Sequence, residues 1–463
     1  MNASPSPFPV LWLCGPPGVG KSTAGWALYR RLAADGTPVG YVDIDQLGIN
    51  YPEPPGDPGR HLLKAGNLAA LVVNYRAEGA RCLVVSGVVD PAAGVDRGHL
   101  PGVDLTLCAL TAGRGELSRR YLGRGTLPED LGRVLAEAEA EAEAEAETEA
   151  ETEAEAESRG AGPSGRPDLR IDTDGRSPAD VVDRVLAHWR PPATAPAPPG
   201  EAARGPERSG ARPAVLLLCG AEAVGKSTVG WEVGQRLRRA GGPAAFVDLG
   251  QVGLLAPAPA DDPGRHRLSA ANLAALLDRY AAVGTRRLVA VGPVPDGATA
   301  DRYRRALRGA PLTLCRLDAG PEALLDRVRR RGAGQAPPLA GDRLRGAPDA
   351  ELRRVAAEAA CEARALTSAA VGDHRVRTDG RSVADVAGAV LGLWEDGARD
   401  AQSGASTTKK VVTNPATRPD ASRPTQVGYA PSPQPDGKAT TPTPDSGSTT
   451  AAGRGAGEGD AVP

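Results

Sequence analysis

"GPPGVGKST" at residues 15–23 recurs as "GAEAVGKST" at residues 220–228. A short apolar run stands directly before each stretch, "VLWLC" at 10–14 and "VLLLC" at 215–219, and a helical pattern follows each. Both stretches fit the spacing GxxxxGK[ST], and they stand between strand and helix, which is the context that gives this spacing its meaning. Each stretch therefore predicts a buried strand, a tight glycine loop and the first turn of a helix.

The residue types of this loop suit an anion. Glycines let successive N–H groups converge on phosphate oxygens, and the helix N-terminus adds the positive end of its dipole. We expect Lys21 and Lys226 to reach the β- and γ-phosphates of a nucleotide, and the hydroxyls of Ser22 and Ser227 to bind Mg²⁺. The predicted nucleotide-binding residues are Gly15, Gly18, Val19, Gly20, Lys21, Ser22, Thr23, Gly220, Val224, Gly225, Lys226, Ser227 and Thr228.

Lysine usage supports the same interpretation. The chain carries almost all its positive charge on arginine, and before the C-terminal tail its only lysines are Lys21, Lys64 and Lys226. Two of the three fall in the glycine loops.

The similarity between the halves extends well beyond the loops. With a shift of about 205 residues, "DPGRHLLKAGNLAAL" at 57–71 matches "DPGRHRLSAANLAAL" at 262–276, and "DTDGRS" at 172–177 matches "RTDGRS" at 377–382. Such self-similarity over a long period indicates an internal repeat. The sequence predicts a tandem duplication of one domain.

Composition divides the rest of the chain. Glu alternates with Ala or Thr through an acidic tract, which we interpret as a solvated helix that expanded by slippage rather than as a functional acidic arm, and Pro, Ala and Gly dominate the stretch between the halves. The predicted segments are a disordered N-terminus at 1–9, a first domain at 10–190 with an acidic insertion at 137–158, a linker at 191–212, a second domain at 213–396 and a disordered tail at 397–463.

Strand and helix patterns alternate within each half. In the first half we expect strands at 10–14, 37–43, 81–86, 105–110 and 170–172, and helices between most of them. Strands that are apolar on both faces and joined by helices form a parallel sheet. The predicted fold class is α/β, with two P-loop NTPase domains that each contain a five-stranded parallel sheet flanked by helices.

Charge and composition exclude several classes. The net charge is −2, but without the eleven Glu of the acidic tract it would be +9, and aromatic residues make up only 3% of the chain. This mild excess suits small phosphorylated molecules and lacks the dense basic stripes of a nucleic-acid-binding protein. We find no apolar run of membrane-spanning length and no signal peptide. We expect a cytoplasmic protein with no nucleic-acid or membrane partner.

Other motifs narrow the P-loop class. A motor ATPase needs an acidic pair after its third strand, but "CLVVSG" at 82–87 and "RLVAVG" at 287–292 end without one. The NKxD motif of GTPases and the LSGGQ motif of transporter ATPases are absent as well.

What remains resembles the small-molecule and nucleotide kinases, the group that includes shikimate, gluconate, adenylylsulfate and adenylate kinases. The resemblance covers most of each half: a P-loop at the start, an acidic motif after the second strand, an Arg-rich lid segment and a closing strand and helix. It implies ATP and Mg²⁺ as cofactors and a small-molecule acceptor as partner.

The resemblance assigns roles to the acidic motif "VDID" at 42–45. Asp43, and Asp248 in the second half, would help Ser22 and Ser227 to hold Mg²⁺, while Asp45 would orient or deprotonate the acceptor hydroxyl. The alternative is that a strand-end Asp only caps the next turn. The second half has Gly250 where the first has Asp45, so it lacks the proposed base.

The same resemblance suggests basic site residues. Arg60 and His61 could clamp an anionic acceptor, although a turn with a solvated Arg explains the same letters. The predicted catalytic residues are Lys21, Asp45, Arg120 and Arg124. Of these, the lid residues Arg120 and Arg124 would neutralise the charge of the transferring phosphoryl group. The alternative is that any one of these arginines is a solvated helix residue.

Two functions follow as hypotheses. The first is a phosphotransferase that moves the γ-phosphate of ATP to a small molecule, with the chemistry in the first half. The second is a nucleotide-responsive binding protein without turnover. The acidic tract interrupts the helix between the lid and the final strand of the first half, which argues against the first half as the active one. The loss of Asp45 argues against the second.

Overall fold

The computed structural model describes residues 6–90, 94–123, 132, 135–136, 167–193, 212–307, 309–335, 342–403 and 411–412. These described residues all belong to one compact unit. We call the described residues up to 193 the first half and those from 212 onward the second half. The acidic insertion at 137–158 and most of the predicted linker lie outside the described residues.

The first half contains the five parallel strands that the sequence predicts. They are β1 (Phe8–Cys14), β2 (Val39–Asp43), β4 (Cys82–Ser86), β5 (Val103–Thr111) and β6 (Leu169–Asp172), and their order in the sheet is β6-β5-β1-β4-β2. The central strands β1 and β4 are buried almost throughout. This burial is why they read as continuous apolar runs rather than as an alternating pattern.

Helices cover this sheet and connect its strands. They are α1 (Lys21–Ala34), α2 (His61–Ala77), α3 (Arg114–Leu122) and α5 (Pro178–His188), with short 3₁₀ turns η1 (Ile44–Leu47), η2 (Pro58–Arg60) and η3 (Arg97–His99). The last helix begins with a full capping box between Ser177 and Asp180.

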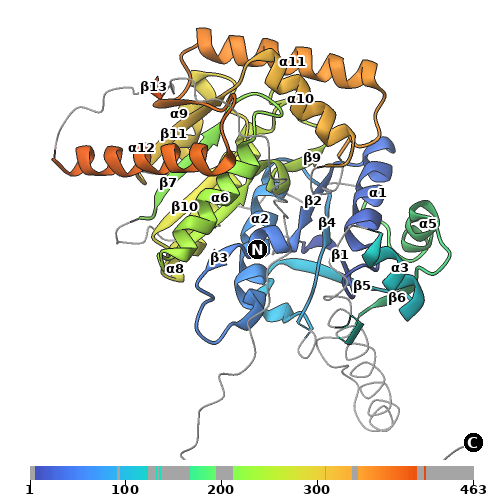
Figure 1. Cartoon of the computed structure of the whole chain (residues 1–463). Helices are drawn as coiled ribbons and strands as arrows, with labels where there is room; N and C mark the ends of the chain where they lie inside the picture. The colour runs from blue at the N-terminus through green and yellow to red at the C-terminus, as the bar shows by residue number, and fades with distance from the viewer. Residues whose placement is uncertain are drawn as a thin grey trace, which may run out of the picture. The chain divides into compact units, whose positions relative to one another are not determined.

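The second half repeats this order of elements (Figure 1). Its parallel strands are β7 (Ala214–Cys219), β8 (Ala244–Asp248), β10 (Arg287–Val291), β11 (Leu312–Asp318) and β12 (His374–Arg377), and its helices are α6 (Lys226–Arg239), α7 (Leu249–Val252), α8 (His266–Ala282), α9 (Gly297–Ala306), α10 (Pro321–Gly332), α11 (Asp349–Ser368) and α12 (Val383–Ser403). The α/β fold class is confirmed in both halves.

Some predicted boundaries differ from the observed elements. Strand β1 begins at Phe8, ahead of the expected start of the first domain at 10. Helix α12 packs against α6 and runs to Ser403, past the expected end of the second domain at 396. Beyond it, β13 (Val411–Val412) pairs with β12 inside the segment predicted as a disordered tail.

The two sheets are not the separate five-stranded units that we expected, because the halves exchange a strand. The short strand β9 (Leu254–Ala256) of the second half pairs antiparallel with β2 of the first. Reciprocally, β3 (Asn50–Tyr51) of the first half pairs antiparallel with β8 of the second. One hydrophobic cluster also spans the halves, with Leu68 and Tyr75 of α2 and Leu273 and Tyr280 of α8 all fully buried in it.

Among the described residues, no helix is long and apolar enough to cross a membrane.

Candidate functional site

The glycine loop of the first half lies at the carboxyl end of the parallel sheet. It joins Cys14 at the end of β1 to Lys21 at the start of α1. The register aligns Leu13 with Ser86 of β4, and Ser86 with Asp43 of β2. The loop, the acidic motif after β2 and the segment after β4 therefore emerge at one edge of the sheet, where open α/β sheets bind their ligands.

Close packing explains the first glycine of the loop. Gly15 has φ of 127°, and a Cβ there would lie 2.2 Å from the carbonyl oxygen of Leu110. Gly220 repeats this arrangement against the carbonyl of Leu317, at 2.4 Å. Only glycine combines this backbone conformation with so close an approach.

The loop lysines have the same contacts in both halves. Lys21 donates to the carbonyl oxygens of Gly15 at 2.6 Å and Pro16 at 2.9 Å. Lys226 donates to those of Gly220 at 2.9 Å and Ala221 at 2.8 Å. Each ammonium group therefore lies over its own loop, close to where the loop amides would hold an anion.

Residues predicted to bind Mg²⁺ lie together in both halves. The hydroxyl of Ser22 donates to Asp43 at 3.2 Å, and that of Ser227 donates to Asp248 at 2.7 Å. Burial, and after it the negative charge of Asp45, raises the pKa of Asp43 to about 7. Burial also raises the pKa of Asp248. A hydroxyl beside a buried carboxylate is a set of hard oxygen donors that suits Mg²⁺.

In the turn after β2, the side chain of the first acidic residue bonds to the backbone amide two residues later. The other carboxylate oxygen of Asp43 accepts from the amide of Asp45 at 3.0 Å and so caps η1. Asp248 accepts from the amide of Gly250 at 2.9 Å in the same way. The capping role is therefore real for Asp43, and it leaves the side chain of Asp45 available for another contact.

That contact is an ion pair with Lys64. Lys64 lies on α2 with only 6% of its surface exposed, and its ammonium group is 2.8 Å from the carboxylate of Asp45. Sequence reasoning gave Lys64 no role, although it is the only lysine before the tail outside the two glycine loops. In the second half Ser269 occupies the matching position, so acid and lysine are lost together.

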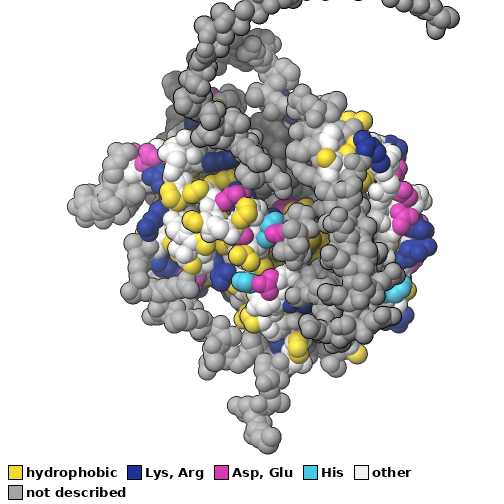
Figure 2. Space-filling model, turned by 90° about the horizontal axis from the view of Figure 1, so that it is seen from below, with side chains coloured by type: hydrophobic (Ala, Val, Ile, Leu, Met, Phe, Trp, Pro, Cys, Tyr) yellow, Lys and Arg dark blue, Asp and Glu magenta, His cyan; other side chains and the backbone are white. Residues whose placement is uncertain are grey.

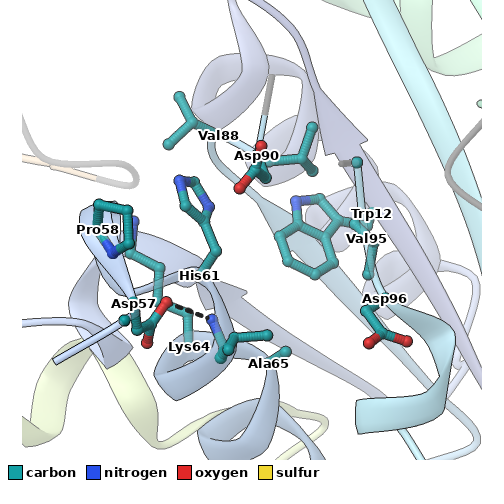
Figure 3. A pocket seen from close by; sticks show the side chains of 14 residues that line it. Trp12, Asp57, Pro58, His61, Lys64, Ala65, Val88, Asp90, Val95 and Asp96 are labelled. Atoms are coloured by element: carbon teal, nitrogen blue, oxygen red, sulfur yellow. Dashed lines mark hydrogen bonds between the residues drawn. The ribbon is translucent and has the colours of Figure 1, made fainter. Parts of the chain in front are cut away.

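Lys64 also lines a cavity of about 180 Å³ beside this turn. The ring of His61 and the indole of Trp12 face the same space, and Asp90 lies at its edge (Figure 3). Asp57 and Asp96 line it as well. A Cβ on Gly87, which precedes the lining residues of this segment, would lie 3.5 Å from a carboxylate oxygen of Asp45 and 2.3 Å from Ile44. Asp45 itself does not line the cavity, and its ion pair with Lys64 joins it to a residue that does.

Most of the cavity's carboxylates are engaged. Asp57 accepts from the amides of Leu62 and Leu63, both at 2.9 Å, and caps α2. Asp96 pairs with His99 at 2.8 Å, and both side chains are exposed. On the face seen in Figure 2, histidine and acidic side chains lie next to each other among hydrophobic ones. Burial, followed by the charge of Lys64, lowers the pKa of His61 and so favours its neutral form.

Arg60 does not line the cavity. Its guanidinium group is buried, donates to the carbonyl of Asn50 at 2.8 Å, pairs with Glu53 at 3.1 Å and stacks over Tyr51. Arg265 likewise donates to Leu255 on the other exchanged strand. Of the two predicted acceptor-binding residues, the structure therefore brings only His61 to the cavity and gives Arg60 a structural role.

Arg120 contacts the glycine loop from α3. It donates to the carbonyl of Val19 at 3.0 Å and to Thr173 at 2.9 Å and 2.8 Å. Arg327 makes the same three contacts, with Val224 and Thr378, in the second half. These bonds hold the loop to the final strand, and the predicted catalytic role of Arg120 stays a prediction. Arg124 lies outside the described residues.

Comparison with known proteins adds structural matches only. No protein-family model and no curated protein matches the chain. A gluconokinase from Sinorhizobium meliloti 1021 is similar at 14% identity, covering 42% of this chain and 98% of its own, with a TM-score of 0.28. Shikimate kinase from Aquifex aeolicus vf5 covers 40% of this chain and 98% of its own, at 18% identity and a TM-score of 0.23. An adenylylsulfate (APS) kinase from Mycobacterium tuberculosis, solved with AMPPNP and APS, covers 40% and 99%, at 23% identity and a TM-score of 0.23.

Proposed function

We propose that the first half is a phosphotransferase that moves the γ-phosphate of ATP to a hydroxyl group of a small molecule in the cavity. One observation carries the proposal: the Asp45 carboxylate lies 2.8 Å from the ammonium group of Lys64, which lines the cavity, while Asp43, two residues earlier, accepts a hydrogen bond from Ser22 beside the glycine loop. A general base must lie within reach of both the acceptor and the phosphate that is transferred.

The nucleotide would occupy the glycine loop. Its phosphates would replace the loop carbonyls as partners of Lys21, and Ser22 and Asp43 would hold Mg²⁺. The described residues contain no group of three or more His, Cys, Asp or Glu that could hold a metal ion, so phosphate oxygens and water would supply its other ligands. The ion would neutralise charge on the β- and γ-phosphates.

The chain's own groups then account for the transfer. Asp45 accepts the proton of the acceptor hydroxyl while the oxygen of that hydroxyl forms a bond to the γ-phosphorus. The bond from that phosphorus to the bridging oxygen breaks, and ADP leaves with the electron pair. Lys64 would hold the Asp45 carboxylate in place through their ion pair.

The lining of the cavity favours an acceptor that is uncharged or carries an amine. Three carboxylates, of Asp57, Asp90 and Asp96, line it with one ammonium group, and that group is already paired with Asp45. The ring of Trp12 offers an apolar face on which the carbon skeleton of a sugar or amino alcohol can pack. Carboxylate or phosphate acceptors would face repulsion here, in contrast to the anionic acceptor expected from Arg60 and His61.

The test is transfer from labelled ATP to pools of acceptors sorted by charge: neutral polyols and sugars, amino alcohols, sugar acids and phosphate esters. We expect labelled product with the first two pools. Lys21→Ala should abolish it, and Lys226→Ala, which makes the matching change in the second half, should leave most of it.

Asp45→Asn separates chemistry from binding in the same assay. We expect turnover to fall about 10²-fold or more, as for loss of a positioned base, with nucleotide affinity nearly unchanged. Loss of nucleotide binding in this variant would contradict the role given to Asp45.

A nucleotide-responsive binding protein without turnover is the second candidate. It is favoured by the second half, which keeps Lys226, Ser227 and Asp248 in place but has no counterpart of Asp45 or Lys64. Magnesium-dependent ATP binding with no labelled product in any pool would select it.

A further inference from the structure

The turn that carries Asp45 is bounded at both ends by contacts with the second half. Strand β2 leads into η1, and its residues Val39 and Tyr41 pair with Ala256 and Leu254 of β9. Strand β3 follows η1, and its Asn50 pairs with Ala245 of β8. The side chain of Asn50 also accepts a hydrogen bond from Thr285 at 2.5 Å.

A direct bond from the second half ends on the turn itself. The carbonyl of Leu47, the last residue of η1, accepts from Asn67 of α2 at 2.7 Å and from the hydroxyl of Tyr280 of α8 at 2.9 Å. Tyr280 has no exposed surface, and burial raises its pKa, so the hydroxyl remains a donor over the whole working pH range.

The second half contains the reciprocal arrangement. The carbonyl of Val252, at the end of α7, accepts from Asn272 at 2.6 Å and from the hydroxyl of Tyr75 of α2 at 3.1 Å. Each turn thus receives one bond from its own half and one from the other. The two turns differ in their contents, because the first carries Asp45 and the second carries Gly250.

We propose that Tyr280 is a positioning residue for the first half: through the Leu47 carbonyl it fixes the turn that holds Asp45 against Lys64, so the second half supports chemistry at a site to which it supplies no reacting group. This inference rests on the proposed function for its kinetic consequence. It gives the second half a reason to persist without its own acid and lysine, since its exchanged strand and its tyrosine hold the active turn.

The test compares Tyr280→Phe with Tyr75→Phe in the full chain. Each substitution removes one buried hydroxyl that donates to a turn of the other half, and that of Tyr75 also has a longer contact, 3.4 Å, with the Tyr41 carbonyl. Both substitutions should therefore lower the melting temperature. Tyr280→Phe should reduce kcat about tenfold with KM for ATP unchanged, because a misplaced base slows transfer but not nucleotide binding. Tyr75→Phe, whose target turn carries Gly250, should keep kcat within about twofold of the wild type.

Hydrogen exchange gives a readout that does not depend on turnover. The amide of Gly48 donates to the backbone carbonyl of Asp45 at 3.2 Å, and the amide of Asn50 donates to the backbone carbonyl of Gly48 at 2.8 Å. Tyr280→Phe should speed exchange at these two amides, whereas Tyr75→Phe should speed it around residues 252–255 instead.

The outcomes separate the two proposals. Equal kcat in the two variants, or unchanged exchange at Gly48 and Asn50 in Tyr280→Phe, would overturn the positioning role. A wild-type protein that transfers no phosphate would overturn the proposed function, and the exchange measurement would still decide whether Tyr280 orders the turn.

Discussion

At the scale of single residues, the positions shared by the halves and those particular to the first half do different work. The shared Asp57 and Asp262 both cap a helix, and the shared Arg60 and Arg265 both hold an exchanged strand. The residues of "DPGRH" therefore have the same structural roles in both halves. Asp45, Lys64, Asp90 and Trp12 have no counterpart in the second half. Of these, Lys64, Asp90 and Trp12 line the cavity, and Asp45 pairs with Lys64.

Ser86 shows why a polar residue particular to the first half need not belong to the site. Its hydroxyl is fully buried and lies 2.8 Å from that of Tyr41. The second half has Val291 and Phe246 at these positions, so both partners are apolar there. Replacing both members of a buried hydrogen-bonded pair costs little, whereas replacing one leaves a polar group unsatisfied.

His61 allows a prediction about pH. Burial and Lys64 lower its pKa from the ordinary value of 6.5 against the opposing effects of Asp90, Asp57 and Asp45. The folded state therefore binds the proton less readily than the unfolded chain, and stability is lost as the pH falls below about 6.5. His61→Gln should reduce the loss in free energy of unfolding between pH 7 and pH 5, measured in urea.

The control for this prediction is His188→Gln, since His188 is exposed on α5. It should keep the acid dependence of the wild type. An unchanged acid dependence in His61→Gln would show that the ring gains no charge on unfolding in this range.

At the scale of elements, α3 and α10 act as supports for the glycine loops. Arg120→Gln removes three hydrogen bonds that join the Val19 carbonyl to Thr173. Hydrogen bonds from a charged donor contribute about 1.5–3 kcal/mol each, and their loss frees the loop. We expect nucleotide affinity to fall about tenfold or more in a Lys226→Ala background, in which titration reads the first loop only.

Arg119→Gln is the matched control on the same helix. The side chain of Arg119 is 71% exposed and pairs only with Glu116 among the described contacts. Exposed ion pairs of this kind contribute little to stability. If Arg119→Gln weakened nucleotide binding as much as Arg120→Gln, the support role of Arg120 would be wrong.

At the scale of the described molecule, the halves are joined by far more than their connecting segment. Two exchanged strands and a buried cluster built from α2 and α8 link them. Gly66 of α2 contributes through its lack of a side chain, because a Cβ there would lie 1.7 Å from the guanidinium of Arg279 on α8. We infer that the described residues form one folding unit with two glycine loops.

Cutting the connecting segment tests this inference. A protease site inserted between residues 194 and 211 should be cleaved without separating the halves, because the exchanged strands and the buried tyrosines remain in place. Size-exclusion chromatography should then show one peak containing both fragments, with separation only in denaturant. Two peaks under native conditions would show that the halves are independent domains.

Much of the site follows from short stretches of sequence. The glycine loops, the helix starts and the Ser22–Asp43 pair depend on residues within one β-loop-α unit and the strand beside it, where spacing predicts position well. The expected parallel strands were confirmed for the same reason, since a run that is apolar on both faces has few other structures available to it. The tandem duplication stays a prediction, and the matching hydrogen bonds of the halves support it.

The remainder was decided by tertiary structure. The amino-acid sequence alone determined two glycine loops with P-loop spacing on α/β sheets. It also showed that the first half has Asp45 where the second half has Gly250. Four features could not be deduced from it: the exchange of strands between the sheets, the ion pair of Lys64 with Asp45, the position of Arg60 away from the cavity, and the hydrogen bond from Tyr280 to Leu47. The last of these contacts joins residues 233 positions apart. Local patterns record whether a residue is buried, but they do not record its partner, because a buried apolar or tyrosine position looks the same whichever distant element covers it.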